Sequence, residues 1–254
     1  MRENKMMREL KEGRVVYGPF VKITDPATVE IAAYSGFDFV IIDLEHGPHS
    51  IEGAQNLIRA AELSDITPVV RVLENNPTHI LRALDIGAQG IEVPHISNKE
   101  DARKTVRAAR FSPQGERGLC RFVRAANYSS VPSDEYIPKE NEEIVVIVHI
   151  EGVEGVKNLR DILEVEGIDI IFLGPYDLSQ SCGVPGKVDH PAVAEKMEEA
   201  VRIAKEAGVK TGTFVDNLEQ AKRWKKAGVQ YISFSVDVGI YYEACSQIVK
   251  RLKE

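Results

Sequence analysis

Apolar runs of strand length recur along this chain, and stretches with helical periodicity separate most of them. The runs are rich in Val, Ile and Phe with little polar alternation, which is typical of strands buried on both faces of a parallel sheet. They predict eight strands, near Val15–Val21, Phe37–Asp43, Thr67–Leu73, Gly90–His95, Ile144–Glu151, Ile168–Gly174, Val209–Val215 and Gln230–Val236.

The stretches between these runs predict amphipathic helices, several of which end at a glycine suited to stop a helix. The first of them starts at Asp25–Pro26. The others lie near Ser50–Leu63, Thr78–Asp85, Asn98–Arg110, Val153–Val165, Pro191–Ala207, Leu218–Ala227 and Gly239–Leu252. This alternation over about 250 residues matches the size and rhythm of a (β/α)₈ barrel. We therefore expect an α/β fold with a single domain, a (β/α)₈ TIM barrel over residues 1–254. A doubly wound open sheet is the alternative, but no G-x-G-x-x-G motif follows the first strand.

The connection Phe111–Glu143 interrupts the alternation, because it shows little strand or helix signal. It carries several arginines and tyrosines, among them Arg117, Arg121 and Tyr128. A loop of this length in a compact domain is usually functional or mobile. We expect it to lie over one end of the barrel, in a position suited to a subunit contact.

Composition narrows the choice of partners and compartment. Hydrophobic residues make up 43% of the chain, and the net charge is −7 with acids and bases interspersed. This charge argues against nucleic acid as a partner, and no apolar run approaches the length that spans a membrane. The N-terminal segment lacks the apolar core of a signal peptide. The three cysteines are odd in number and lack metal-site spacing, which indicates a reducing compartment without a disulfide. We therefore expect a cytoplasmic protein.

Ionisable side chains gather where the second and third predicted strands end. Asp43, Glu45 and His46 follow the second strand, and Arg71 stands late in the third. The carboxyl ends of parallel strands meet at one mouth of a barrel, where ligands bind, so these residues indicate an active site. A polar turn is the alternative for one strand alone, but the pattern recurs. A buried guanidinium such as that of Arg71 is costly unless it is paired or binds an anion.

The fifth and sixth predicted strands also end in ionisable residues. His149 and Glu151 stand two positions apart and share one face, and Asp177 comes just after the sixth strand. Two carboxylates beside open positions suit a hard divalent cation with oxygen ligands. Capping of a following helix is the alternative for each acid taken alone. His95 also ends a strand, but its neighbours in the sequence indicate no role beyond packing.

Short motifs occur in a fixed order along the chain. They are Asp43–Leu44–Glu45–His46–Gly47, Arg71, Asp85–Ile86–Gly87–Ala88–Gln89, Pro113, Gly115, Arg117–Gly118, Ile150–Glu151 and Gly174–Pro175–Tyr176–Asp177–Leu178–Ser179. Together they resemble the HpcH/HpaI aldolase family, from about Gly18 to the last helix. This family consists of class II, metal-dependent pyruvate aldolases that act on 4-hydroxy-2-oxo acids. The resemblance implies an aldehyde-lyase that reversibly cleaves such an acid to pyruvate and an aldehyde.

The resemblance also implies roles for single residues. Glu151 and Asp177 would hold Mg²⁺, Mn²⁺ or Co²⁺, which would chelate the oxo acid. Arg71 would stabilise the enolate oxygen, and His46 would be the general base. Asp43 would order water beside the metal, with Glu45 in a supporting position. Backbone amides near Tyr176 and Asp177 would bind the substrate carboxylate.

A homo-oligomer, in particular a hexamer, is a further implication of the resemblance. Asp85 of one subunit would reach His46 of its neighbour and raise its basicity. The last helix, Tyr241–Leu252, carries apolar residues at helical spacing. We expect this face to pack on its own barrel or to be exchanged with a partner subunit.

Two positions depart from the family pattern, and they leave other functions open. His149 stands where the family commonly has glutamine, and Tyr176 stands where it has a small residue. We expect Tyr176 to contact the substrate and alter its range, and His149 either to donate a hydrogen bond to the substrate or to become a third metal ligand. A Schiff-base aldolase would need a desolvated lysine, for which Lys22 is the candidate, although a solvated surface charge is the more common state. A citrate-lyase-type enzyme and a binding protein without turnover are the remaining alternatives.

Overall fold

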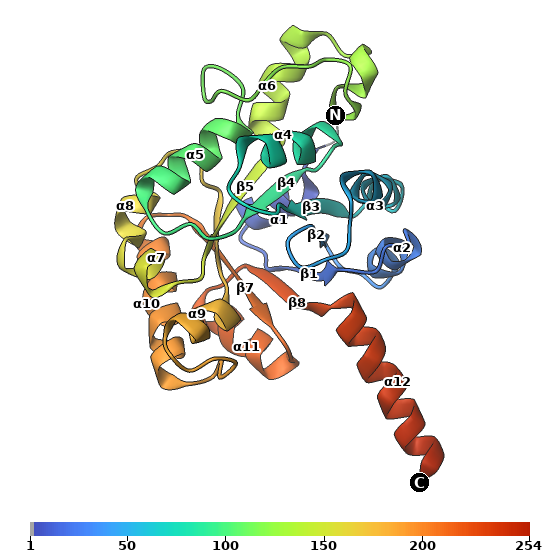
Figure 1. The fold of residues 1–254 in the computed structure, drawn as a ribbon, viewed down its shortest axis with the longest axis vertical. Coiled ribbons are helices and arrows are strands. Elements are labelled where there is room, and N and C mark those ends of the chain that lie inside the picture. The colour runs from blue at the N-terminus through green and yellow to red at the C-terminus, as the bar shows by residue number, and fades with distance from the viewer. Residues whose placement is uncertain (1–2) are drawn as a thin grey trace.

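Eight parallel strands close into a barrel in chain order within the computed structural model, which describes residues 3–254 (Figure 1). The strands are β1 (Val16–Val21), β2 (Phe39–Asp43), β3 (Thr67–Arg71), β4 (Gly90–Val93), β5 (Val145–Ile150), β6 (Ile170–Leu173), β7 (Lys210–Val215) and β8 (Tyr231–Val236). The barrel closes by pairing of β1 with β8. The predicted (β/α)₈ barrel is therefore confirmed, and the open doubly wound sheet is excluded.

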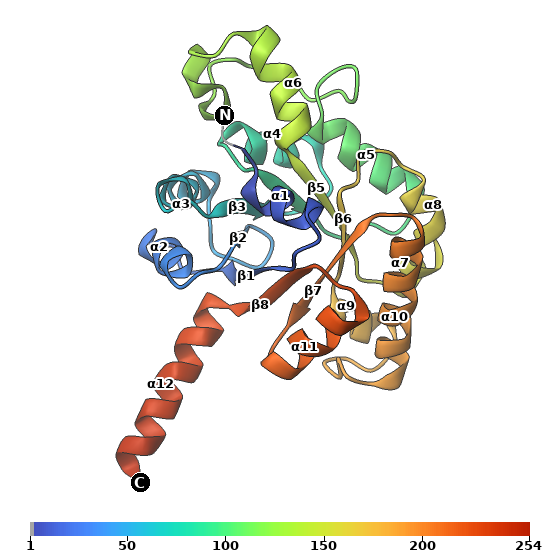
Figure 2. The same ribbon diagram turned by 180° about the vertical axis from the view of Figure 1, so that it is seen from behind.

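Most of the helices surround the barrel on its outer side, whereas α1 (Lys5–Lys11) lies across its amino-terminal end and α12 (Asp237–Lys253) projects away from it (Figures 1 and 2). The others are α2 (Ala27–Tyr34), α3 (Ile51–Leu63), α4 (Pro77–Asp85), α5 (Lys99–Ala109), α6 (Ser133–Glu143), α7 (Val153–Lys157), α8 (Leu159–Leu163), α9 (Pro175–Ser181), α10 (Pro191–Glu206) and α11 (Leu218–Ala227). The predicted helix Val153–Val165 is divided into α7 and α8, because Asn158 leaves helical geometry. Among residues 3–254, no helix is long and apolar enough to cross a membrane.

The barrel interior is filled by apolar side chains toward its amino-terminal end. Met6 and Leu10 of α1 are fully buried there, and the backbone N–H of Met6 donates to Thr67 at the start of β3. Above them, the rings of Phe39 and Tyr231 stack with their centroids 4.1 Å apart. A second apolar layer lies between the strands and the surrounding helices. At the carboxyl-terminal mouth, polar side chains lie beside the aromatic rings of Phe20, Phe172 and Phe214.

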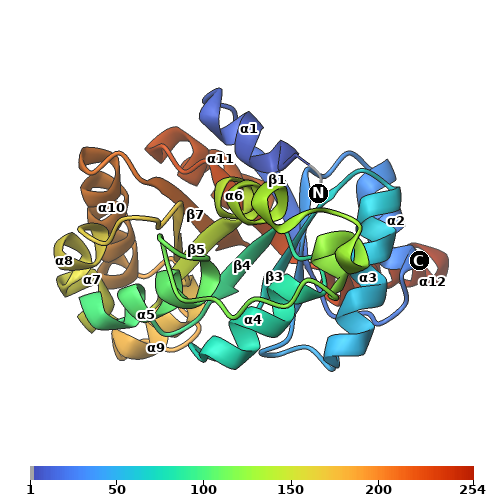
Figure 3. The same ribbon diagram turned by 90° about the horizontal axis from the view of Figure 1, so that it is seen from above.

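The connection over residues 111–143, between α5 and β5, is more ordered than predicted. A 3₁₀ turn, η1 (Arg124–Ser129), packs beside α4, and α6 follows it and ends just before β5 (Figure 3). The expectation of little helix was wrong for α6, whose signal is weakened by Pro138 and by a polar composition. The segment lies at the amino-terminal end of the barrel, where Glu143 accepts a hydrogen bond from the backbone of Asn4. It is therefore remote from the strand mouth.

The last helix, α12, leaves the barrel (Figures 1 and 2). Asp237 is its one buried residue among the described positions, and it accepts hydrogen bonds from the backbone N–H groups of Lys22 and Ile23. These bonds anchor the start of α12 to the end of β1. Beyond that point the helix projects outward, and apolar residues such as Tyr242 and Leu252 are exposed. Of the two arrangements expected for this helix, packing on its own barrel is therefore excluded, and exchange with a partner subunit stays a prediction.

Candidate active site

The carboxyl ends of the strands surround a cavity of about 450 Å³. Its polar lining consists of Lys22, Asp43, His46, Arg71, His149, Glu151, Tyr176, Asp177 and Asp216. Aromatic rings of Phe20, Phe172 and Phe214 form an apolar wall. Most of the predicted site residues thus converge here, as expected for a barrel whose ligands bind at this end.

A bidentate ion pair fixes Arg71 at the cavity. Asp43 and Arg71 are the last residues of β2 and β3, and the parallel register places them side by side. Arg71 Nε lies 2.9 Å from Asp43 Oδ1, and Nη2 lies 2.7 Å from Oδ2. Burial alone would raise the pKa of Asp43, but the hydrogen bonds and charge of Arg71 outweigh it and lower the pKa. The carboxylate therefore stays ionised and holds the guanidinium in one orientation.

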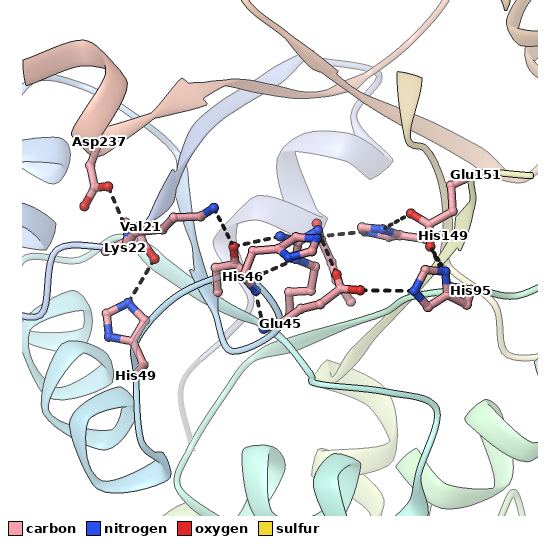
Figure 4. A network of polar contacts seen from close by, with 12 residues as sticks. Val21, Lys22, Glu45, His46, His49, His95, His149, Glu151 and Asp237 are labelled. Atoms are coloured by element: carbon pink, nitrogen blue, oxygen red, sulfur yellow. Dashed lines mark hydrogen bonds and ion pairs between the residues drawn. The ribbon is translucent and has the colours of Figure 1, made fainter. Parts of the chain in front are cut away.

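The imidazole of His46 lies at the same cavity and is exposed (Figure 4). Its backbone N–H donates to Asp43, which fixes the turn after β2. Within residues 3–254 the ring makes no hydrogen bond or ion pair. A ring in this condition is free to accept a proton from a bound ligand.

His149 lies beneath the mouth between two glutamates. Its Nε2 is 3.0 Å from Glu92 Oε2, and its Nδ1 is 3.4 Å from Glu151 Oε2. Burial alone would lower the pKa of His149, but hydrogen bonds and charges of the two glutamates raise the pKa to about 9. Burial alone would raise the pKa of Glu151, but its contacts with His149 and His95 outweigh this effect and lower the pKa to about 2. Glu151 is therefore an ionised carboxylate at the cavity.

His95 belongs to this polar network, so its assignment to packing alone was wrong (Figure 4). Its backbone N–H donates to Glu151 Oε1 at 2.7 Å, and its ring Nδ1 lies 2.8 Å from the same oxygen. Its Nε2 lies 3.2 Å from Glu45 Oε1, while Glu45 Oε2 lies 2.9 Å from Arg71 Nη1. The sequence signal was present, because His95 follows β4 as the other site residues follow their strands.

Asp177 and Tyr176 enter the cavity from the start of α9. The Asp177 carboxylate is exposed and makes no hydrogen bond or ion pair within the described part of the chain. The Tyr176 hydroxyl donates to Asp216 Oδ2 at 2.9 Å. Gly174 lets this turn approach closely, because a Cβ there would lie 2.9 Å from the Cβ of Glu151. The carboxylates of Glu151 and Asp177 thus come from adjacent strand ends to one cavity.

These two carboxylates fit an open site for a hard divalent cation. Asp177 is free to bind, Glu151 is ionised, and two oxygen donors leave positions for water and a chelating ligand. No group of three or more metal-ligating side chains is assembled in residues 3–254, so the chain does not fit a closed, structural metal site.

Asp85 is not brought to the cavity of its own chain. It ends α4 at the opposite end of the barrel, where its Oδ1 lies 2.9 Å from Nη2 of the buried Arg117. Arg117 also pairs with Glu140 at 2.9 Å and lies over the ring of Phe111. A role of Asp85 toward His46 therefore requires a second subunit, and it stays a prediction.

Lys22 lies in the cavity lining, so its description as a solvated surface charge was wrong. Its Nζ is 3.6 Å from Asp43 Oδ2, and its side chain is 28% exposed. A Schiff-base lysine is activated by desolvation or by a neighbouring cation. The contact with Asp43 and the partial exposure of Lys22 supply neither condition.

Comparison with known proteins agrees with this site. The sequence pattern of the family described as HpcH/HpaI aldolase/citrate lyase matches residues 17–244. A 4-hydroxy-2-oxo-heptane-1,7-dioate aldolase from Shigella flexneri is 36% identical over 250 residues, which cover 98% of this chain and 93% of the relative.

Solved structures are similar over almost the whole fold. A family protein from Burkholderia cenocepacia J2315 has a TM-score of 0.94 and 32% identity, covering 99% of this chain and 100% of its own. The citrate synthase SbnG has a TM-score of 0.89 and 36% identity, covering 97% of this chain and 96% of its own. The chain therefore belongs to the HpcH/HpaI aldolase/citrate lyase family.

Proposed function

We propose that this chain is a carbon–carbon lyase that reversibly cleaves a 4-hydroxy-2-oxo acid to pyruvate and an aldehyde. The observation that carries the proposal is the convergence of three kinds of group in one cavity. They are a fixed guanidinium, a free imidazole and a pair of carboxylates, supplied by Arg71, His46, Glu151 and Asp177. The similarity to a 4-hydroxy-2-oxo-heptane-1,7-dioate aldolase supports this substrate class.

In the cleavage direction, His46 takes the proton of the substrate 4-hydroxyl. The C3–C4 bond then breaks, its electrons pass toward the C2 oxygen as an enolate, and C4 leaves as the aldehyde. Arg71 faces the developing negative charge with an orientation already set by Asp43, so little reorganisation is needed. Return of a proton to C3 gives pyruvate, and the reverse sequence gives aldol addition.

Glu151 and Asp177 are the residues that would hold Mg²⁺, Mn²⁺ or Co²⁺ in this reaction. When bound, the cation supplies Lewis-acid stabilisation of negative charge on the oxo acid. The backbone N–H groups near Tyr176 and Asp177 would bind the substrate carboxylate. Tyr176 narrows the cavity from the α9 side and, with its bond to Asp216, restricts the groups that fit there.

Pyruvate formation from a panel of 4-hydroxy-2-oxo acids, coupled to lactate dehydrogenase, tests the proposed activity. We expect NADH oxidation with at least one dioic substrate in the presence of Mn²⁺, Co²⁺ or Mg²⁺. A binding protein without turnover would bind the acids and release no pyruvate from any of them.

Borohydride treatment in the presence of pyruvate separates this mechanism from Schiff-base catalysis. We expect the protein mass to be unchanged and its activity to survive, because Lys22 lies beside Asp43 and is partly exposed. Intact-mass spectrometry checks this result. A reduced pyruvate adduct on Lys22 would contradict it, and a Lys22→Arg variant would locate the adduct.

Citrate-forming condensation is a second candidate function, because the citrate synthase SbnG is 36% identical over 97% of this chain. The same cavity would then bind an oxo acid with carboxylate groups, and its keto carbon would accept the new carbon–carbon bond. Incubation with oxaloacetate and acetyl-coenzyme A, followed by detection of citrate, tests it. Citrate formation without any release of pyruvate from hydroxy-oxo acids would favour this candidate over the aldolase.

We further propose a homo-oligomer, a hexamer in particular, in which α12 is exchanged between subunits and Asp85 reaches the neighbouring His46. Two observations support this assembly. The apolar face of α12 has no partner on its own barrel, and the His46 ring has none within the described residues. Exposed apolar residues on α2, Ile31 and Tyr34, offer a surface of matching character.

Deletion of residues 240–254 should dissociate the oligomer, because it removes most of the exposed apolar face of α12. Multi-angle light scattering checks the mass, and a Lys250→Ala variant on the same helix serves as the control that keeps the assembly. A fully active monomer of the intact chain would contradict both the exchange of α12 and the proposed role of Asp85.

We propose a cytoplasmic location because the cysteines are not paired in disulfides. Cys120, Cys182 and Cys245 are all free thiols in the structure, so the described fold contains no disulfide. Proteins that fold without disulfides are typical of reducing compartments. Fractionation of the producing cells with a cytoplasmic marker tests this location.

A further inference from the structure

His95 occupies an unusual position at the end of β4. Its φ is +60°, in the left-handed region that residues other than glycine and asparagine rarely adopt. Its side chain is 68% exposed, so apolar packing does not hold it there. The local conformation must therefore be maintained by the polar contacts that His95 makes.

Those contacts place two nitrogens of His95 against one carboxylate oxygen. The left-handed backbone directs the His95 N–H at Glu151 Oε1, and the ring brings Nδ1 to the same atom, at 2.7 and 2.8 Å. Glu45 contacts the opposite ring nitrogen at 3.2 Å, which fixes the plane of the imidazole. Glu151 Oε1 therefore has two short contacts with His95, whereas Oε2 has a single long contact, at 3.4 Å to His149.

We infer that His95 is a positioning residue that orients Glu151 to bind the divalent cation. This inference rests on the proposed metal-dependent function. The backbone hydrogen bond and the ring contact fix the rotation of the Glu151 carboxylate, so that its other oxygen keeps one orientation at the cavity.

Glu45 gives this positioning a second consequence. It joins His95 to Arg71, so one chain of contacts runs from the predicted oxyanion-stabilising residue to the predicted metal ligand. A change at His95 therefore alters the metal site directly and reaches Arg71 only through Glu45. Residues that orient metal ligands by hydrogen bonding typically account for about 10–100-fold in metal affinity.

Mn²⁺ binding to the full-length protein without substrate, followed by electron paramagnetic resonance, tests the inference. His95→Gly removes the ring, accepts the left-handed backbone and keeps the N–H donor. We expect it to weaken Mn²⁺ binding about 10–100-fold. His95→Asn also tolerates this backbone and retains a side-chain donor near the Nδ1 position, so we expect it to bind Mn²⁺ within about threefold of the wild type.

Asp65 provides a matched control, because it has a φ of +64° and pairs with Lys5 at the amino-terminal end of the barrel. Asp65→Gly should leave Mn²⁺ affinity unchanged, while circular dichroism verifies that each variant is folded. Unchanged or tighter Mn²⁺ binding by His95→Gly would overturn the inference, as would an equal loss in His95→Asn. A wild-type protein that binds no Mn²⁺ would overturn the proposed metal dependence, and this inference with it.

Discussion

Removal of divalent cations with EDTA should abolish pyruvate release, and Mn²⁺, Co²⁺ or Mg²⁺ should restore it. Cleavage leaves negative charge on the pyruvate half, which an aldolase stabilises with either a cation or an iminium. Lys22 lacks the environment of an iminium-forming lysine, whereas Glu151 and Asp177 present carboxylates to the cavity. Without a cation, the two acids would repel each other across the shared site.

Variants of the two carboxylates should make this loss irreversible. Glu151→Gln and Asp177→Asn keep the side-chain shapes but remove the charge that a hard cation requires, so added metal should not rescue them. Asp216→Asn is the matched control, because Asp216 lines the same cavity but is bonded to Tyr176. Its metal dependence should match that of the wild type. Full activity of the wild type in EDTA would contradict the proposed mechanism.

His46→Ala should lower the rate of pyruvate release by about two to four orders of magnitude, the usual contribution of a general base. The ring is exposed at the cavity and makes no hydrogen bond or ion pair within residues 3–254, so its removal should leave the fold and Mn²⁺ binding intact. Single-turnover kinetics with a saturating substrate measures the chemical step without a contribution from weaker binding.

His190→Ala is a suitable control for this experiment. His190 precedes α10 on the surface and lies outside the residues that line the cavity. We expect its turnover to equal that of the wild type. Near-normal turnover of His46→Ala would show that another group accepts the hydroxyl proton, and His149 would be the first residue to replace.

The barrel and much of its mouth could be predicted because both follow from local patterns. Strands buried on both faces show as continuous apolar runs, and parallel strands place their carboxyl ends together. Asp43 and Arg71 illustrate this, since the register of β2 and β3 makes the buried arginine and its carboxylate partner neighbours. The convergence of Glu151 and Asp177 follows in the same way from adjacent strands.

His95 was misjudged because its partners are remote in the sequence. Glu45 and Glu151 follow other strands, and only the closed barrel brings them to both nitrogens of one ring. The left-handed backbone of His95 could not be inferred from the sequence either, because histidine usually avoids this conformation. A histidine after a buried strand is therefore better treated as a candidate site residue wherever the neighbouring strands also end in acids.

The last helix shows a different limit. An amphipathic pattern indicates that one face of α12 is apolar, but packing on its own barrel and packing on a partner require the same pattern. The anchoring of Asp237 to the end of β1 determines the direction in which the helix leaves. Such a long-range contact cannot be inferred from periodicity.

Stoichiometric analysis of one reaction tests the central claim most directly. The purified protein, supplied with Mn²⁺, is incubated with 4-hydroxy-2-oxo-heptane-1,7-dioate, and pyruvate and aldehyde are measured together. We predict one pyruvate and one aldehyde for each substrate molecule consumed, with no product in the Glu151→Gln variant. Consumption of no substrate by the folded, Mn²⁺-loaded wild-type protein across the whole panel of 4-hydroxy-2-oxo acids would contradict the assignment as a pyruvate aldolase.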